Sequence, residues 1–484
     1  MNLPGTVTDQ ELSGFARTAP TRATVWTPDS VKAVENHLGD TFDRGVVARG
    51  LGRSYGDAAQ NAGGHVLDAT ALDRILDLDL DAGTVTCDPG VTLATLMQVL
   101  IPLGWFPTVI PGTRFVTVGG AIASDIHGKF RLGSFADFVE AATLATPAGE
   151  VLAISDDDAA GRDAWWATAG GMGLTGVVTR ATLRLHPIET AWMQVDTERC
   201  ADVDDCMSRM LATDDRYRYS VAWIDTMAKG GALGRSVLER GDHARLSSLD
   251  AKHARRARDY APRVSIELPT WMPNGLINGL SIKAFNELWF RKAPKEHRDE
   301  IRSIVGFFHP LDAVLGWNHV YGSRGLLQYQ FVVPYGAERV VRVALERFAA
   351  TGAPSFLAVL KRFESENAGH LSFPMPGWTL AIDVPTGIDG LSAMLDDLDD
   401  LVIEAGGRVY LAKDSRLSGS RLAAMYPRLE EWRDVQARLD PNGTMQSDLD
   451  RRLGVTRRPR AASKAPSSKP PTKPKRRTTK KESS

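Results

Sequence analysis

Three glycine-rich loops in the N-terminal part of the chain constrain its fold most. The first runs over 49–57 and follows an apolar run at 45–48 that is typical of a short buried strand. Its glycines let the backbone approach a ligand closely, and successive N–H groups in such a turn can bind phosphate oxygens. An isolated loop of this kind is equally typical of a surface turn. Because loops at 111–124 and 170–176 repeat the pattern, we expect one large phosphate-bearing ligand.

The context of these glycines disfavours a nicotinamide dinucleotide site. In the first loop, Tyr55 stands where a third glycine would be needed. The run at 171–176 does fit G-x-G-x-x-G, but that motif requires a strand before it and a helix after it. Here the order is reversed, since 163–168 is helical in pattern and 177–183 alternates like a strand.

The length and composition are those of a globular protein of two or three domains. The chain has 484 residues, of which 43% are hydrophobic, and no apolar run approaches the roughly 18 residues of a membrane-spanning helix. The N-terminus lacks the basic and apolar segments of a signal peptide. Cys87, Cys200 and Cys206 match neither a disulfide framework nor a metal-binding pattern. We therefore expect reduced cysteines, no metal site, and a cytoplasmic protein or one peripheral to the plasma membrane or cell envelope.

The net charge of −1 conceals an uneven distribution. Residues 455–484 contain eleven Lys and Arg residues and a single acid, Glu482, which leaves 47 basic and 58 acidic groups in the remainder, a net charge of −11. The Lys, Pro and Ser composition of this tail predicts disorder. The composition of the tail suits an anionic lipid or a nucleic acid as partner, but it favours a solvated appendage without a partner. We expect no nucleic-acid partner.

The hydrophobic pattern changes near residue 190. Before it, the pattern predicts mixed strands and helices: helices at 28–38, with Asp29 or Ser30 as cap, and 92–100, strands at 65–68, 75–80, 84–87 and 177–185, and a hairpin of 139–145 with 150–154. After it, strands at 220–224, 327–333, 355–360 and 379–384 alternate with helices at 337–350 and 389–405. This predicts an antiparallel sheet with helices on one face. The segment 243–300 reads as irregular, basic and then aromatic, and 421–453 as helical.

Several of these segments together resemble the FAD-dependent oxidases of the vanillyl-alcohol oxidase type. The resemblance is carried by 49–57, 111–120, 125–129 and 410–416, with support from 308–312, 328–331 and 371–378, and it extends over about 14–453. Within that family the motifs are most similar to the oxidases that act on the 2′-hydroxyl of decaprenylphosphoryl-β-D-ribose. A related FAD-dependent sugar, alditol or aldonolactone oxidase with a soluble substrate is the alternative.

The resemblance implies an α+β fold in which a two-part PCMH-type FAD-binding domain flanks a substrate domain with an antiparallel sheet covered by helices. The implied domains are 1–190 for the first FAD part, 191–407 for the substrate domain, 408–453 for the C-terminal return and 454–484 for the disordered basic tail. The implied FAD-binding residues are Ala48, Arg49, Gly50, Leu51, Gly52, Arg53, Ser54, Tyr55, Gly56, Asp57, Ala58, Gly112, Thr117, Val118, Gly119, Gly120, Ser124, Asp125, Ile126, His127, Val177 and Tyr410.

The chain departs from the family pattern at three places. Many relatives bind FAD covalently through a histidine in a G-x-G-H-S loop, where this chain has Arg53, so we expect dissociable FAD. An arginine can instead pair with a pyrophosphate. After Lys129, residues 130–135 replace a longer, histidine-containing insertion, which makes the exact sugar an open question. Ala381 stands where some members carry a cysteine that covalent inhibitors attack, so we expect covalent trapping to fail.

Oxidation of a secondary alcohol requires a hydride acceptor, a group that takes the hydroxyl proton, and a charge that stabilises reduced flavin. The candidate catalytic residues are Lys413, for proton removal or charge, and His127. The candidate substrate-binding residues are Lys129, Gln328, Gln330, Lys361, Ala381 and Lys413. The resemblance implies three partners: a polyprenylphosphoryl sugar substrate, an NADH-dependent short-chain reductase that completes an epimerisation for cell-wall arabinan, and a peripheral membrane contact.

Overall fold

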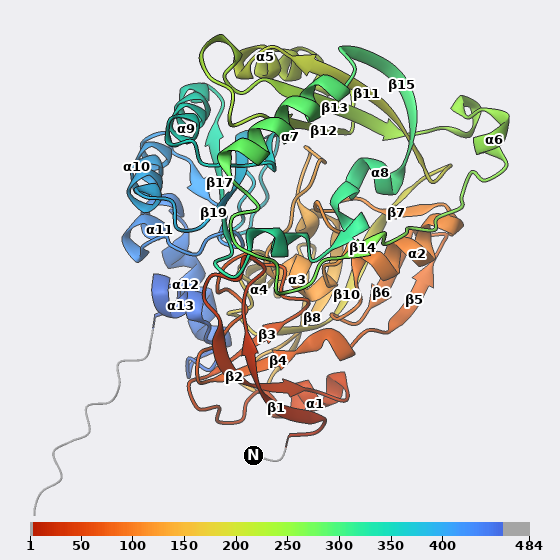
Figure 1. Ribbon diagram of the computed structural model, residues 1–484. Helices are drawn as coiled ribbons and strands as arrows, with labels where there is room; N and C mark the ends of the chain where they lie inside the picture. The colour runs from red at the N-terminus through yellow and green to blue at the C-terminus, as the bar shows by residue number, and fades with distance from the viewer. Residues whose placement is uncertain (1–2, 458–484) are drawn as a thin grey trace, which may run out of the picture.

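The computed structural model describes residues 3–457, and a four-stranded sheet opens this part of the chain (Figure 1). It consists of β1 (Thr6–Leu12), β2 (Thr21–Thr27), β3 (Val46–Arg49) and β4 (His65–Asp68), in the order β1-β2-β4-β3. The predicted first helix is α1 (Val31–His37), and its cap is Ser30, whose hydroxyl accepts a hydrogen bond from the Ala33 N–H. β3 pairs in parallel with β4 and delivers the chain into the first glycine loop.

A six-stranded antiparallel sheet carries the other two glycine loops. It contains β5 (Ile75–Asp79), β6 (Thr84–Cys87), β7 (Trp105–Pro107), β8 (Val139–Ala145), β9 (Val151–Ile154) and β10 (Val177–Pro187). Three helices accompany it: α2 (Leu93–Leu103), α3 (Val118–Ala123) and α4 (Arg162–Thr168). The predicted strands, hairpin and helices of this region are confirmed. The order of α4, glycine loop and β10 also confirms that the 171–176 glycines do not sit between a strand and a helix.

An eight-stranded antiparallel sheet forms the upper part of Figure 1. Its strands are β11 (Trp192–Cys200), β12 (Tyr219–Ile224), β13 (Ser236–His243), β15 (Glu296–Ser303), β17 (Leu326–Pro334), β18 (Ala358–Phe363), β19 (Gly377–Pro385) and β20 (Arg408–Val409), in the order β15-β11-β13-β12-β18-β19-β17-β20. The helices α5 (Val203–Thr213), α9 (Glu338–Thr351) and α10 (Leu391–Glu404) pack on it. The predicted antiparallel sheet with helices is confirmed, although the strand predicted at 355–360 begins only at Ala358.

The prediction that 243–300 is irregular was wrong. This segment contains α6 (Ala251–Ala254), β14 (Ile266–Glu267), which pairs with β16 (Val314–Leu315), the fourteen-residue helix α7 (Gly279–Lys292) and most of β15, which leads into α8 (Ile304–Phe308). β15 escaped detection because it is a half-exposed edge strand of mostly charged residues without apolar alternation. α7 escaped detection because its apolar residues are spread around the helix, so they do not form a single stripe.

The C-terminal return consists of three helices, α11 (Gly419–Met425), α12 (Leu429–Leu439) and α13 (Asp448–Leu453), where the sequence predicted one helical piece. Proline at 427 and the Pro-Asn-Gly turn at 441–443 interrupt it, as their lack of helical backbone preference requires. α12 packs against α4, and Met445 bridges to Val46 beside the first sheet. The return therefore contacts the N-terminal part of the fold, as the resemblance implied.

The folded chain continues beyond the boundary expected at residue 454. Val455 is fully buried, the Thr456 N–H donates to Asp450 over 2.7 Å, and Arg457 pairs with Glu430 and Asp434. Residue 454 was therefore too early a start for the tail, and the part predicted to be disordered from 458 lies outside the described residues. Among residues 3–457, none of the helices combines the length and apolarity that a bilayer crossing requires.

Candidate active site

A cavity of about 940 Å³ lies between the glycine loops and one face of the eight-stranded sheet. Most of the residues proposed from the sequence line it. These are Ala48, Arg49, Gly50, Leu51, Gly52, Arg53, Ser54, Tyr55, Ala58, Gly112, Thr117, Gly119, Gly120, Ser124, Ile126, His127, Lys129, Val177, Gln328, Gln330, Lys361, Ala381, Tyr410 and Lys413. Four others, Gly56, Asp57, Val118 and Asp125, are not among the lining residues. The structure therefore gathers residues from both ends of the chain around one space.

The first two glycine loops are packed against each other, so that no side chain fits between them. A Cβ atom on Gly50 would lie 2.1 Å from the hydroxyl oxygen of Thr117, the residue that caps α3 by accepting a hydrogen bond from Gly120. A Cβ atom on Gly52, where φ is +63°, would lie 2.2 Å from the Arg49 guanidinium. Gly112 is different, since a Cβ there would meet nothing within 4 Å. The backbone at Gly112 therefore faces the open space of the cavity.

The residues of this half of the cavity fit FAD. Main-chain segments from three glycine loops converge on it, which suits a long phosphate-bearing group. Arg53 supplies a cation, with its guanidinium 5.3 Å from the centre of the Phe15 ring and its Nε donating to the Phe115 carbonyl over 3.2 Å. Burial lowers the pKa of this guanidinium, although nearby Asp312 opposes the effect. Arg49 is engaged elsewhere, because its guanidinium donates to the Ala59 and Ser13 carbonyls.

Two of the residues that do not line the cavity hold its loops in place. The buried carboxylate of Asp125 accepts hydrogen bonds from Ser134 over 2.8 Å and Asn367 over 2.8 Å, and also from Ser372. Asp57 pairs with Arg452 of α13 over 2.8 Å, and Arg452 also pairs with Asp414 over 2.7 Å. The side chains of Asp125 and Asp57 therefore hold the loops around the cavity and do not line it. The sequence motif alone did not distinguish these two roles.

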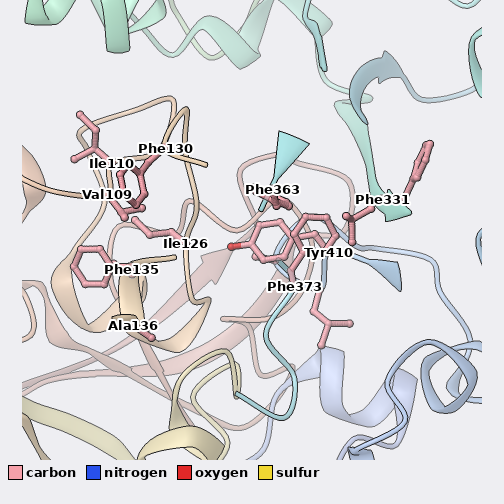
Figure 2. Packing of buried hydrophobic residues seen from close by; sticks show 14 of the residues in the cluster. Val109, Ile110, Ile126, Phe130, Phe135, Ala136, Phe331, Phe363, Phe373 and Tyr410 are labelled. Atoms are coloured by element: carbon pink, nitrogen blue, oxygen red, sulfur yellow. The ribbon is translucent and has the colours of Figure 1, made fainter. Parts of the chain in front are cut away.

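His127 lies in an aromatic box. Its ring centre is 5.0 Å from that of Phe363, 5.3 Å from Phe373 and 5.1 Å from Tyr410. Figure 2 shows the rings of Phe363, Phe373 and Tyr410 together, with the Tyr410 hydroxyl directed toward the segment that carries Ile126; this hydroxyl donates to the Ser124 carbonyl over 2.8 Å. Burial is the main reason that the pKa of His127 is well below its usual value, so the imidazole is neutral at physiological pH.

Both ring nitrogens of His127 have partners on the sheet. Nε2 lies 3.1 Å from the Gln330 amide and Nδ1 lies 3.3 Å from the Lys361 ammonium nitrogen. Burial, followed by the nearby charges of Lys413 and Lys129, lowers the pKa of Lys361 to about 7. A neutral imidazole carries one N–H, so it can accept a hydrogen bond at one nitrogen only. The Lys361 ammonium can therefore donate to Nδ1 of the neutral imidazole, and this contact fixes the position of the His127 ring.

Lys413 lies over the ring of Tyr55, with its nitrogen 3.8 Å from the ring centre. Burial lowers the pKa of Lys413 to about 8, and the Asp383 carboxylate opposes that shift. Burial likewise raises the pKa of Asp383 to about 7, against the effects of Gln328, Lys413 and Tyr55. The amide of Gln328 donates to Asp383, which is its partner in the β17–β19 register. A lysine and a carboxyl group that both titrate near neutral pH therefore lie in one buried cluster.

The period-two pattern of the sheet explains which side chains face the cavity. Gln330 is paired with Ala381 across β17 and β19, and Val359 of β18 is paired with the same alanine. Residues two apart on a strand share a face, so Gln328, Gln330 and Lys361 line the cavity together. Ala381 also lines the cavity, and its methyl group offers no nucleophile.

A second charged group forms another part of the cavity wall. The Lys129 ammonium donates to the Phe307 carbonyl over 2.5 Å, lies 3.9 Å from the Phe307 ring centre and is 3.6 Å from Glu239. Glu239 also pairs with Arg302 over 2.5 Å. Burial lowers the pKa of Lys129 to about 8.

Sequence reasoning missed several residues that line the cavity or lie directly behind its wall. Glu239 and Arg302 belong to strands that were not predicted, so no pattern placed them near the site. Asp383 was detectable, since it is a lone acid in the apolar strand run at 379–384, and a buried acid in such a run is typically paired or functional. Phe363 and Phe373, which enclose His127, carried no signal that distinguishes them from core residues.

Comparison with known proteins agrees with a cavity that fits FAD. A family model described as an FAD binding domain matches residues 23–155, and one described as D-arabinono-1,4-lactone oxidase matches residues 385–453. A decaprenylphosphoryl-β-D-ribose oxidase of Mycolicibacterium smegmatis is 41% identical over 92% of this chain and 98% of its own length. A Streptomyces coelicolor protein, encoded in the mprA 5′ region, is 38% identical over 75% of this chain and all of its own. An L-gulono-1,4-lactone dehydrogenase of Mycobacterium tuberculosis is 22% identical over 88% of this chain and 94% of its own.

Proposed function

The chain belongs to the decaprenylphosphoryl-β-D-ribose oxidase family and is an FAD-dependent oxidoreductase; from this premise we propose that it oxidises the 2′-hydroxyl of decaprenylphosphoryl-β-D-ribose to the 2′-keto intermediate. The observation that carries the proposal is that Lys413, His127 and Lys361, which come from three distant parts of the chain, line the same cavity as the glycine loops. These groups face the half of the cavity that fits FAD.

The residues named above supply what an alcohol oxidation requires apart from the hydride acceptor. The chemistry that FAD would supply when bound is the acceptance of a hydride from the carbinol carbon. Lys413, with a pKa of about 8, takes the hydroxyl proton in its neutral form. Gln330, Gln328 and Lys361 present donors and acceptors to the sugar hydroxyls along one face of the sheet. The aromatic box holds His127 in a fixed orientation beside Lys361.

A phosphate-bearing substrate suits the cations of this cavity. Lys129 and Lys361 both have pKa values lowered by burial, so the single negative charge of a polyprenylphosphoryl sugar's phosphodiester would stabilise their charged forms. Lys129 is already balanced in part by Glu239. Binding of a sugar phosphate should therefore be accompanied by proton uptake near pH 7.

Four features of the reaction setting belong to this proposal. FAD is bound without a covalent bond, because Arg53 stands where the covalent relatives have histidine. An NADH-dependent short-chain reductase consumes the keto product and completes the epimerisation to the arabinose donor. Because a polyprenyl chain is insoluble, the enzyme meets its substrate as a peripheral protein at a bilayer surface. Substrate-binding roles fall to Lys129, Gln328, Gln330, Lys361, Ala381 and Lys413, all of which line the cavity.

One observation favours a second candidate function. The match of 385–453 to the D-arabinono-1,4-lactone oxidase model includes Lys413, so a soluble aldonolactone or alditol substrate is the alternative.

Anaerobic bleaching of the flavin absorption separates the two candidates. We expect a polyprenylphosphoryl ribose to bleach the flavin, and the matched 2′-deoxy compound, which lacks the reacting hydroxyl, to leave it unchanged. Bleaching by alditols or aldonolactones but not by the polyprenylphosphoryl sugar would replace the proposed function by the alternative.

A further inference from the structure

We propose that α7 and the residues leading into it form the surface by which the protein docks on an anionic lipid bilayer, and that the polyprenyl tail leaves the cavity beneath this helix. We name as the docking face the side chains of Leu276, Leu280, Phe285, Leu288 and Trp289. This inference rests on the proposed polyprenyl substrate for the path of the tail, but the docking itself can be measured without substrate.

The outward side of α7 is apolar and exposed. The side chains of Leu280 and Leu288 are 81% and 68% exposed, and they lie two helical turns apart on one side of the helix. In the segment leading into α7, Leu276 and Trp271 are 42% and 77% exposed. Single exposed leucines are ordinary, but such a row of large apolar side chains marks an interaction surface.

The opposite side of α7 is firmly attached to the sheet domain. The buried Asn286 side chain donates to Asp225 over 2.8 Å and to the Ser355 carbonyl over 3.2 Å. Ile282 is buried on the same side of the helix, and at the margin of the exposed side Glu287 pairs with Arg235 over 2.6 Å. Figure 1 shows α7 near β12 and β13. Its apolar side is therefore presented by a fixed helix, and the exposure does not come from a helix that has lost its packing.

A third side of α7 lines the cavity mouth. Phe285 and Trp289, one turn apart, stack with ring centres 6.0 Å apart, and both line the cavity together with Lys292. From Phe285, aromatic contacts continue inward: its ring lies 6.0 Å from Phe356, which lies 6.1 Å from Trp317.

The same aromatic series ends at the catalytic cluster. Trp317 lies 5.3 Å from Phe15, and Phe15 lies 5.2 Å from Tyr55, the ring that carries Lys413. An apolar wall thus connects the reacting end of the cavity to the docking face. A prenyl chain attached to a sugar phosphate near Lys413 can follow this wall and leave the protein where the exposed leucines begin.

Charge identifies a bilayer as the occupant. The segment 245–295 contains ten Lys and Arg residues and four acids, whereas the chain before residue 455 carries a net charge of −11. Basic residues beside an exposed apolar helix face are the pattern of interfacial helices that bind anionic lipids. Lys283, Arg291 and Lys292 lie on α7 itself and are exposed. A second copy of this chain would place these cations against each other, which disfavours a symmetric dimer through this face.

Co-sedimentation with phosphatidylglycerol-containing vesicles, without substrate, tests the docking face. The double variant L280E/L288E should lose about tenfold or more in vesicle affinity, because it removes two apolar groups and adds two negative charges. Its flavin absorption and melting temperature should match those of the unaltered protein. Its rate of anaerobic reduction by a soluble short-chain polyprenylphosphoryl ribose should stay within about twofold. The matched control is L76E/L80E, which makes the same change at two exposed leucines on and beside β5. Equal affinity of the two double variants would overturn the proposal.

A labelling experiment gives an independent readout. The three native cysteines are buried, so a single exposed Cys can be labelled selectively. A bimane on L288C should be quenched by vesicles of brominated lipid, and one on L80C should not. Concentration-dependent dimerisation that L280E/L288E abolishes, with L288C unquenched, would assign the face to a second copy and overturn the bilayer assignment. Vesicle binding without any reduction by the short-chain substrate would instead contradict the proposed function and leave the docking intact.

Discussion

At the scale of single residues, the site depends on lysines whose pKa values burial lowers toward neutral pH. Lys413 and Lys361 have pKa values of about 8 and about 7, and burial is the main cause for both. A lysine in water is almost fully charged at pH 7 and takes up no proton. In this cavity, Lys413 can act as a base near its pKa of about 8. The Asp383 carboxylate raises that pKa and so limits the loss of the proton.

The first prediction concerns Lys413. The variant Lys413→Ala should retain bound FAD, but its anaerobic flavin reduction by substrate should be slower by about a hundredfold or more, within the range for a lost acid–base group. Stopped-flow absorbance measures this rate. Lys32→Ala, which removes a lysine whose side chain is 72% exposed, is the control and should leave the rate unchanged. Near-normal reduction in Lys413→Ala would assign Lys413 a packing role only.

The second prediction follows from the charge on Asp383. If neutral Lys413 is the base, flavin reduction speeds up as pH rises and levels off above its pKa of about 8. The Asp383 carboxylate raises that pKa, so Asp383→Asn should lower it and move the rising limb of the pH profile to lower pH. Asp389→Asn, at an exposed acid on the same segment, should leave the limb in place. A limb that stays or moves to higher pH in Asp383→Asn would contradict this reading.

The third prediction is the release of FAD. Because Arg53 cannot form the histidine–flavin bond, precipitation with acid should leave yellow flavin in the supernatant. The absorption spectra of pellet and supernatant measure this directly. A yellow pellet above a colourless supernatant would show a covalent bond to another residue.

At the scale of elements, the sequence predicted those parts whose patterns are local. β4, β6 and β8 were placed nearly to the residue because each alternates or is apolar between turn residues. β11, β15 and α7 were missed because tertiary contacts stabilise them: β15 is an edge strand rich in charges, held by ion pairs such as Arg302 with Glu239.

The candidate site also contains a part that the sequence predicted and a part that it did not. The glycine loops, His127 and Lys413 were found by motif, and the structure brings them to one cavity. Asp125 and Asp57 were assigned to the cofactor by the same motifs, yet their side chains fix the loops from behind. A motif records which residues occur together, and it does not say which way each side chain points.

The fourth prediction concerns the joint between α13 and the first glycine loop. Arg452 holds Asp57 and Asp414 together, and Asp414 is almost fully buried. Arg452→Met should lower the free energy of unfolding by about 1–3 kcal/mol, since it leaves carboxylates without their partner, and should weaken FAD binding because the loop loses an anchor. Arg457→Met removes a more exposed pair on the same segment and should cost about 0–1 kcal/mol. Chemical denaturation and FAD titration compare the two, and equal effects would refute a special role for Arg452.

At the scale of the whole molecule, the active site is assembled from parts distant in sequence. Loops near residue 50 supply one wall, strands between 326 and 385 the other, and Tyr410 and Lys413 return from the C-terminal part. The substrate proposed for this cavity is confined to a membrane. The acidic charge of most of the chain opposes approach to an anionic surface, and two basic regions oppose that repulsion: the segment before and within α7, and the residues after 457.

The last prediction separates these two basic regions by salt. Residues 458–484 contain ten Lys and Arg residues and one acid, and each cation near an anionic leaflet contributes roughly 1 kcal/mol of attraction. That attraction is electrostatic, so it should fade as the Debye length shortens to about 8 Å at physiological ionic strength, whereas burial of the α7 leucines should persist. The truncation belongs after Arg457, because a cut after Leu453 would also remove the buried Val455.

The shortened chain should keep its FAD and its turnover of a soluble short-chain substrate. Its co-sedimentation with phosphatidylglycerol vesicles should be weaker at low salt and should approach that of the full chain as salt rises. The control is a full-length chain in which the tail's Lys and Arg are changed to Gln, which should match the truncation if charge is the cause. Equal sedimentation of full-length and truncated chains at low salt would remove the tail from membrane attachment and leave α7 to account for it.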